Sequence, residues 1–163
     1  MYDTIRKNID RYIGLNFKRR DNVTACTFIG HKNAGNNIRE DLKNIISNLI
    51  ENNNAKQFYV GNHGNFDYMV QSVLKELSTE YTKINYNVVL AYIPEKKSEN
   101  LEYENSIYPD GLEYKPPKFA IIERNKWMIK NSDYLVCYVK NTVSNAYKFK
   151  EYANEKGKFI IEL

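Results

Sequence analysis

The fold of this chain can be deduced from one stretch, which reads Phe58-Tyr-Val-Gly-Asn-His-Gly-Asn-Phe-Asp-Tyr68. A short apolar run ends at Val60 in a turn rich in glycine and asparagine, and apolar residues then recur at helical spacing as far as Leu77. This order predicts a strand, a tight turn and a helix. Because strands and helices alternate along the rest of the sequence as well, the stretch predicts an α/β protein.

The turn in this unit is a candidate ligand site. Gly61 and Gly64 can adopt positive φ and let a ligand approach the backbone, while Asn62 or Asn65 can cap the helix that follows. The N–H groups of the first helical turn and the helix dipole favour an anion there. Asp67 in that turn either offsets the dipole or accepts a hydrogen bond from a ribose-like hydroxyl. A tight turn without a ligand explains the same pattern, so the assignment depends on the other loops.

The composition indicates one folded domain. The chain has 163 residues, of which 42% are hydrophobic, and this excludes a disordered chain. The net charge of +4 is spread along the sequence and speaks against nucleic acid as a partner. Cys26 and Cys137 fall in predicted strands and are expected to be buried free thiols, and the two histidines lack a carboxylate cluster, so no metal or other cofactor is expected. No signal peptide or membrane span is apparent, which predicts a cytoplasmic protein.

The predicted architecture is a Rossmann-like sheet of five mainly parallel strands in the order 3-2-1-4-5, with helices on both faces. Residues 1–22 form an N-terminal amphipathic helix extension that packs on the body or on another subunit, and a homodimer is expected. Residues 23–163 form the domain. Residues 95–117 are too long for a plain connection and are predicted to be a lid. The other predicted strands are 24–29, 86–93, 134–139 and 159–163, and the other predicted helices begin near residues 38, 119 and 145.

Parallel sheets of this kind bind ligands beyond the carboxyl ends of their strands. His31 follows the first strand, where it can bind phosphate or cap a turn, and Lys32 beside it can neutralise phosphate or remain solvated. Arg124 is left free once Ile121, Ile122, Met128 and Ile129 are assigned to the helix core. Its fork suits phosphate, although a surface pair with a neighbouring glutamate explains it equally. Trp127 either packs or stacks on a base, and packing is favoured.

Four segments, in this order, resemble the SLOG superfamily of Rossmann-like proteins, which includes the LOG phosphoribohydrolases. The strand and turn Cys26–His31 resemble the family's opening strand, and Tyr59–Asp67 resembles its Tyr-Gly-Gly-Gly turn. The ending Ile93-Pro94 is similar to its Ile-Pro, and Glu123-Arg124-Asn125-Lys126-Trp127-Met128 is similar to its Glu-Arg-Lys-x-x-Met. The likeness covers residues 23–163 and is greatest to bacterial SLOG-family proteins with Phe-Tyr-Val-Gly-Asn and Arg-Asn-x-Trp-Met segments.

The chain departs from the LOG enzymes after the fourth strand. Their Pro-Gly-Gly-x-Gly-Thr loop and catalytic glutamate are replaced by Val139–Lys148, which contains no glycine and no acid. The resemblance therefore implies a nucleotide-like small molecule as ligand and favours binding without catalysis. The alternatives are a nucleoside monophosphate hydrolase, in which Arg124 acts with Asp67 or with a lid acid (Glu102, Glu104 or Asp110), and a structural or protein-interaction module. The expected ligand-binding residues are Gly30, His31, Lys32, Gly61, Asn62, Gly64, Asn65, Asp67, Arg124, Asn125, Thr142, Ser144 and Asn145.

Overall fold

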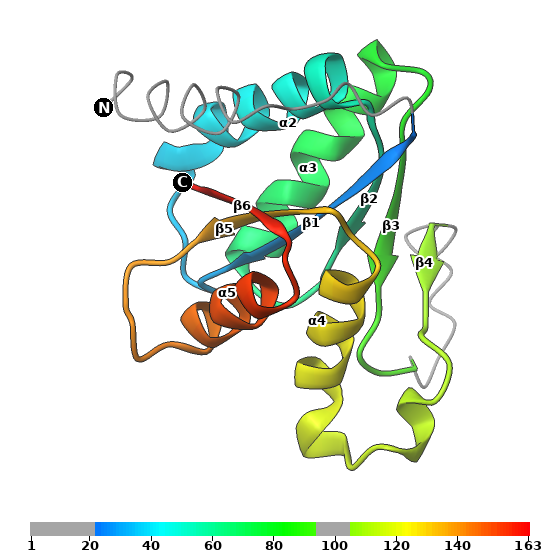
Figure 1. The fold of residues 1–163 in the computed structure, drawn as a ribbon, viewed down its shortest axis with the longest axis vertical. Helices are drawn as coiled ribbons and strands as arrows, with labels where there is room; N and C mark the ends of the chain where they lie inside the picture. Colours follow the sequence, from blue (N-terminus) through cyan, green and yellow to red (C-terminus); the bar gives the residue numbers. More distant parts are fainter. Residues whose placement is uncertain (1–21, 94–104) are drawn as a thin grey trace.

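A six-stranded sheet, parallel throughout, runs through the molecule (Figure 1). This computed structural model describes residues 22–93 and 105–163. Residues 1–21, nearly all of the predicted N-terminal helix, and residues 95–104 of the predicted lid lie outside the described residues. The strands are β1 (Thr24–Gly30), β2 (Ala55–Val60), β3 (Asn85–Val89), β4 (Ser106–Ile107), β5 (Tyr134–Tyr138) and β6 (Phe159–Glu162).

The strand order is β4-β3-β2-β1-β5-β6, so the five predicted strands lie in the predicted order and the predicted number of strands is wrong. The sixth strand, β4, comes from the predicted lid. It is held by hydrogen bonds from the Val88 N–H to the Asn105 carbonyl (2.9 Å) and from the Leu90 N–H to the Ile107 carbonyl (2.8 Å). Two residues are too few to give an alternating apolar pattern, which is why the sequence did not reveal this strand.

The third strand is shorter than predicted, since β3 ends at Val89 and not at Ile93. On one side its neighbour β2 ends at Val60, opposite Val88, so no partner remains there for residues farther along. Tyr92 and Ile93 are exposed. The apolar run therefore extends past the strand, because burial of Leu90 and Ala91 beyond its end requires the same residue types.

Helices cover both faces of the sheet. A pair of α-helices packs on each face and forms a separate apolar layer with it. In the first layer, α2 and α3 pack on the face of β1 that presents Cys26 and Phe28. In the second, α4 and α5 pack on the opposite face, where Ile29 and Cys137 lie. Alternating side chains of one strand thus enter different layers. The helices are η1 (Asn36–Ile38), α2 (Arg39–Asn53), α3 (Asn65–Glu80), η3 (Leu112–Tyr114), η4 (Pro117–Phe119), α4 (Ala120–Lys130) and α5 (Asn145–Glu155).

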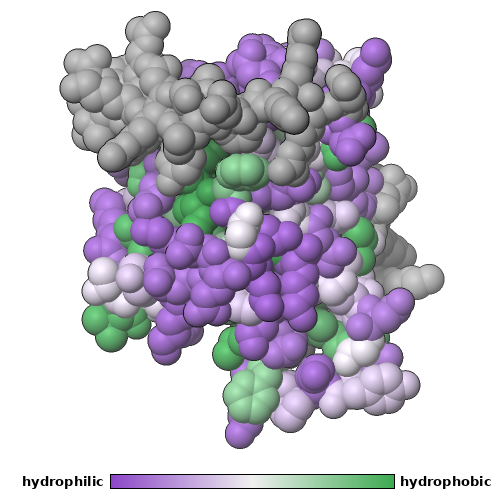
Figure 2. Space-filling view, viewed as in Figure 1, coloured by the Kyte–Doolittle hydropathy of each residue, from purple (hydrophilic) through white to green (hydrophobic). Residues whose placement is uncertain are grey.

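On the face shown in Figure 2, the described residues that are visible are largely hydrophilic, with apolar side chains in patches between them. Among residues 22–93 and 105–163, no helix is both long and apolar enough to cross a membrane.

Candidate functional site

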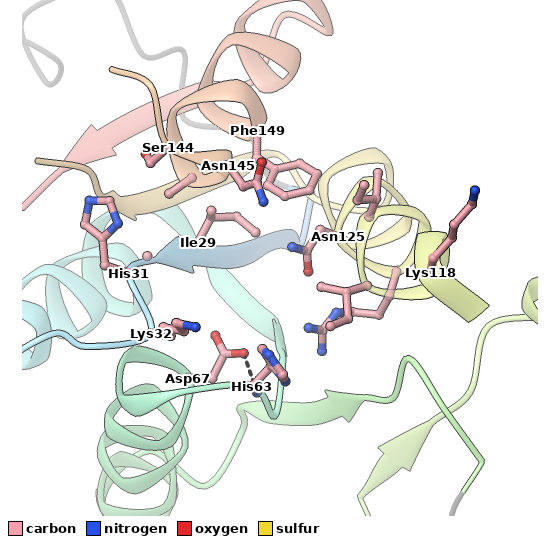
Figure 3. A pocket seen from close by; sticks show the side chains of 15 residues that line it. Ile29, His31, Lys32, His63, Asp67, Lys118, Asn125, Ser144, Asn145 and Phe149 are labelled. Carbon is pink, nitrogen blue, oxygen red and sulfur yellow. Dashed lines mark hydrogen bonds between the residues drawn. The ribbon is translucent and has the colours of Figure 1, made fainter. Parts of the chain in front are cut away.

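A cavity of about 440 Å³ opens at the carboxyl edge of the sheet (Figure 3). One side is formed by the loops after β1 and β2 and by the start of α3, and the other by α4 and α5. We call these the loop side and the helix side. The lining residues are Ile29, Gly30, His31, Lys32, His63, Asp67, Lys118, Ile121, Ile122, Arg124, Asn125, Ser144, Asn145, Ala146 and Phe149.

The loop side is built by direct backbone packing between two turns. The Asn65 N–H donates to the Lys32 carbonyl at 2.8 Å. Gly64 has φ of 104°, and a Cβ there would lie 2.4 Å from the Lys32 Cβ. Gly30 lies so close to the ring of Phe66 that an added Cβ would be 2.4 Å away. These glycines therefore let the turns and the start of α3 come into contact.

Gly61 lies next to Asp67 and Arg124, which form the charged centre of the cavity. A Cβ at this position would lie 2.3 Å from Asp67 Oδ2 and 2.6 Å from Arg124 Nη1. Asp67 is held against the same turn, because its carboxylate accepts the His63 N–H at 2.9 Å (dashed in Figure 3). The absence of a side chain at Gly61 thus leaves the space that both charged groups approach.

Arg124 reaches from α4 to the loop side and is only 1% exposed. Its Nη1 donates to the Val89 carbonyl at 2.8 Å and to Asn62 Oδ1 at 3.4 Å. Its Nε is buried and has no hydrogen-bond partner among the described residues. Burial lowers the pKa of the guanidinium, and the carboxylate of Asp67 opposes that shift. Arginine remains protonated even so, and the cavity therefore contains a buried positive charge.

Asp67 is the negative member of this centre. Burial raises the pKa of its carboxyl group, and the positive charge of Arg124 and the His63 N–H act in the opposite direction. Desolvation outweighs the two favourable contacts, so ionisation of Asp67 is disfavoured relative to an exposed aspartate.

His31 and Ser144 both have structural contacts at the edge of the cavity. His31 Nε2 accepts the Lys140 N–H at 2.8 Å, which ties the end of β1 to the loop after β5. Ser144 caps α5 by accepting the Tyr147 N–H at 3.2 Å, and its hydroxyl donates to the Asn141 carbonyl at 2.6 Å.

The structure brings most of the predicted site residues to the cavity. Those that line it are Gly30, His31, Lys32, Asp67, Arg124, Asn125, Ser144 and Asn145. Gly61, Asn62, Gly64 and Asn65 are not part of the lining and instead contact the residues that are. Thr142 is exposed and lies apart from it, as does Asp110 among the predicted lid acids. Glu102 and Glu104 lie outside the described residues.

Most of the lining residues outside the predicted set lie on the helix side, and Ile29 and His63 lie outside that set too. Lys118, Ala146 and Phe149 were not predicted, and Ile121 and Ile122 were assigned to the helix core although they line the cavity and are only half-buried. A signal was present, because 118, 121, 122 and 125 have the i, i+3, i+4, i+7 spacing of one helical face. Trp127, whose ring packs edge-on against Tyr59 at 5.3 Å, lies in the second apolar layer.

The lining is electropositive. Lys32, Lys118 and Arg124 contribute three positive charges, against the single carboxylate of Asp67. Within the described ranges, no group of three histidine, cysteine, aspartate or glutamate side chains could hold a metal ion. The cavity can therefore bind an anionic ligand through side-chain cations and the N–H groups at the start of α5.

Comparison with known proteins gives similarities of fold. No protein-family model and no curated protein matches the chain. Among solved structures, DNA processing protein A (DprA) from Streptococcus pneumoniae has a TM-score of 0.61 at 14% identity, over 85% of this chain and 49% of that one. DNA processing protein A from Helicobacter pylori, studied for its single-stranded DNA binding mode, has a TM-score of 0.59 at 17% identity, over 89% of this chain and 67% of that one. The chain thus spans about half the length of the first structure.

This comparison corrects two expectations. The predicted function, binding of a small nucleotide-like molecule, and the exclusion of nucleic acid are both wrong when set against structural neighbours that process and bind DNA. The error has a physical cause, since a net charge of +4 does not reveal a local excess of cations, and a mononucleotide and a strand present the same phosphate group. What the comparison shows is the fold: a Rossmann-like α/β domain similar to that of these DNA-processing proteins and consistent with the SLOG resemblance.

Proposed function

We propose that this chain binds single-stranded DNA across the cavity at the carboxyl edge of its sheet. The observation that carries the proposal is the charge of the lining, where three cations oppose one carboxylate in an open cavity. Single-strand binding proteins combine such positive grooves with exposed aromatic rings. The fold shared with the Helicobacter pylori protein supports the same choice. Membership of the SLOG superfamily and a cytoplasmic setting are parts of this proposal.

The exposed cations lie on opposite sides of the cavity. Lys32 extends from the loop after β1, and Lys118 extends from the turn that precedes α4 (Figure 3). A strand that crosses the opening passes between them, so both amino groups reach its phosphates. The buried guanidinium of Arg124 adds attraction that salt screens less than it screens the exposed lysines.

Exposed aromatic rings follow cavity residues in the sequence or lie near the start of α4. Phe119 directly follows Lys118, and Tyr68 directly follows Asp67, with 43% and 57% of their surfaces exposed. Tyr92 is 52% exposed, and its hydroxyl donates to the Pro117 carbonyl at 3.1 Å, which holds the ring near the start of α4. Stacking on such rings tolerates any base and requires that the base be unpaired.

The test is fluorescence anisotropy with a labelled dT20 oligonucleotide and with the corresponding duplex. We expect wild type to prefer the single strand and to lose affinity steeply with salt. Lys32→Gln and Lys118→Gln should each weaken binding by up to about fivefold, as expected for an exposed charge pair, and should each reduce the salt slope by roughly 0.7.

Lys75→Gln is the matched control. It removes the same charge from an exposed position of α3 that does not line the cavity, so its affinity and salt slope should equal those of wild type. Absence of binding to the single strand at low salt would refute the proposed function. Equal losses in all three variants would place the contact surface elsewhere.

A further inference from the structure

We infer that Asp67 competes with the phosphates of the strand inside the cavity, and that binding of the strand is coupled to the uptake of a proton by this carboxylate. This inference rests on the proposed function and adds a regulation of the same site. A carboxylate that lines an anion-binding cavity repels the ligand, whereas a protonated carboxyl group does not.

Asp67 is built into the anion site itself. It lies in the first turn of α3, it lines the cavity, and only 9% of its surface is exposed. A Cβ at Gly61 would lie 2.3 Å from Asp67 Oδ2 and 2.6 Å from Arg124 Nη1, so the carboxylate and the guanidinium approach the same point. A phosphate that is attracted to Arg124 therefore comes close to Asp67 as well.

Protonation of Asp67 removes this repulsion without disturbing the turn. Oδ2 accepts the His63 N–H at 2.9 Å (dashed in Figure 3), so a proton taken from solvent can reside on Oδ1 and leave that bond intact. The neutral group can then donate to a phosphate oxygen. Burial raises the pKa of Asp67 and favours the neutral form, although Arg124 and His63 oppose the shift. A bound phosphate places another negative charge nearby and raises that pKa further.

The other charged or titratable groups of the cavity come from four elements. Arg124 extends from α4, Lys118 from η4, His63 from the turn after β2, and His31 and Lys32 from the loop after β1. Histidines gain positive charge on acidification, which strengthens anion binding in the same direction. The effect of the carboxyl group is therefore isolated by comparing proteins that retain all five side chains.

The experiment measures the protons taken up when dT20 binds. Wild type and Asp67→Asn are studied by titration calorimetry at pH 6 in two buffers of different ionisation enthalpy, because the difference in heat gives the number of protons. Asparagine keeps the size of the side chain and an acceptor for the His63 N–H. We expect wild type to take up more protons than Asp67→Asn, by up to about one for each bound protein.

The affinity for dT20 at constant salt is the second measurement. At pH 7.5, Asp67→Asn should bind about 3- to 100-fold more tightly, the range for unit charges roughly 6 Å apart at effective dielectric constants between about 80 and 20. The difference should narrow as pH falls towards the raised pKa of Asp67, since wild type then loses its repulsive charge. Asp110→Asn is the matched control, exposed and apart from the cavity, and should bind as wild type does.

The possible results separate this inference from the proposed function. Weaker binding by Asp67→Asn would identify the carboxylate as a contact of the ligand and would overturn the inference. Equal proton uptake by the two proteins would overturn it too, and binding of dT20 would still support the proposed function. Wild type alone provides a further check, because no uptake between pH 5 and 7 contradicts the coupling whether or not the variant folds. Absence of dT20 binding by wild type at low salt would overturn both.

Discussion

The two sides of the cavity are built in different ways. On the loop side, backbone meets backbone and side chain so closely that Gly30, Gly61 and Gly64 have no room for a Cβ. On the helix side, the lining consists of side chains that project from α4 and α5 into open space. The loop side therefore depends on particular glycines and tolerates no enlargement, whereas the helix side can change its side chains without moving the backbone. Sites that combine a fixed anion-binding turn with a variable wall can keep one chemistry while changing specificity.

The largest expected effect comes from the residue that joins the two sides. Arg124→Ala removes a buried cation that favours ionisation of Asp67 and the donor to the Val89 carbonyl. Truncating this fully buried side chain leaves a cavity and an unpaired carbonyl, which together cost about 3–5 kcal/mol, so the free energy of unfolding should fall by about that amount. Urea denaturation followed by circular dichroism measures it.

Arg39→Ala is the control for charge and size. Arg39 pairs with Glu76 at 2.7 Å on the surface, where the two side chains are 36% and 39% exposed. The expected cost is below about 1 kcal/mol. Equal costs for the two arginines would mean that Arg124 is not the link between the two sides.

The next effect tests how tightly the loop side is packed. Gly61→Ala forces a Cβ against Asp67 and Arg124 and should cost about 1–3 kcal/mol, as overpacked sites do, together with a loss of DNA affinity. Gly35→Ala meets only the flexible end of the Asn37 side chain and should change the free energy of unfolding by less than about 1 kcal/mol. Thermal melts of both variants measure the difference. Indistinguishable melting temperatures would contradict the tight packing of the loop side around Gly61.

A smaller effect tests how the helix side is positioned. Ser144→Ala removes the side-chain acceptor for the Tyr147 N–H and should cost about 1 kcal/mol, typical of a lost N-cap. Ser72→Ala, at an exposed position within α3, should stay within about 0.5 kcal/mol of wild type. Chemical denaturation of the pair gives the difference, and a cost as small as that of the control would show that the cap does not fix α5.

The smallest effect concerns pH. Burial raises the folded-state pKa of Asp67 above its ordinary value of 3.8, so the folded protein binds this proton more tightly than the unfolded chain. The stability that Asp67 contributes is greatest below pH 3.8 and is lost as pH rises through the folded-state pKa. Relative to Asp67→Asn, wild type should therefore gain stability as pH falls from 7 towards 4.

Another carboxylate titrates in the opposite sense. Salt bridges to Lys43 and Arg39 lower the pKa of Glu76 from 4.5 to about 2, so its contribution is lost as pH falls through that range. Glu76 is present in both wild type and Asp67→Asn, and its effect cancels in the difference. Parallel stability curves for the two proteins, or a relative loss for wild type on acidification, would contradict the shift assigned to Asp67.

Local patterns predicted most of the fold and one side of the site. Apolar spacing and glycine turns placed the main strands, the main helices and the candidate residues from Gly30 to Asp67, because a strand–turn–helix unit is encoded within some twenty residues. The two-residue strand β4 was missed since its pairing with β3 depends on the sheet and not on its own composition. The end of β3 was misplaced because the buried residues Leu90 and Ala91 continue the apolar run beyond the end of the strand.

The helix side was missed because the helical spacing of residues 118, 121, 122 and 125 does not by itself show how α4 and α5 rest on the sheet. Ile121 and Ile122 have the residue type of a core position, and only the packed structure shows that they face a cavity. Arg124 illustrates the same limit. The sequence singled it out as a free cation, whereas its burial against the Val89 carbonyl requires β3, the turn after β2 and α4 to meet.

The division of the interior into two layers allows the opening of each layer to be measured through its own cysteine. Cys26 lies in the first layer and Cys137 in the second, and the sheet separates them. Burial raises the pKa of Cys137 to about 12 and that of Cys26 still further, so neither thiol ionises near neutral pH, and each reacts with a thiol reagent only when its layer opens. The modification rate of each cysteine thus reports how often its own layer opens, independently of the other layer. Phe149 belongs to the layer of Cys137. A ligand bound against α4 and α5 should therefore slow the modification of Cys137 and leave the modification rate of Cys26 unchanged.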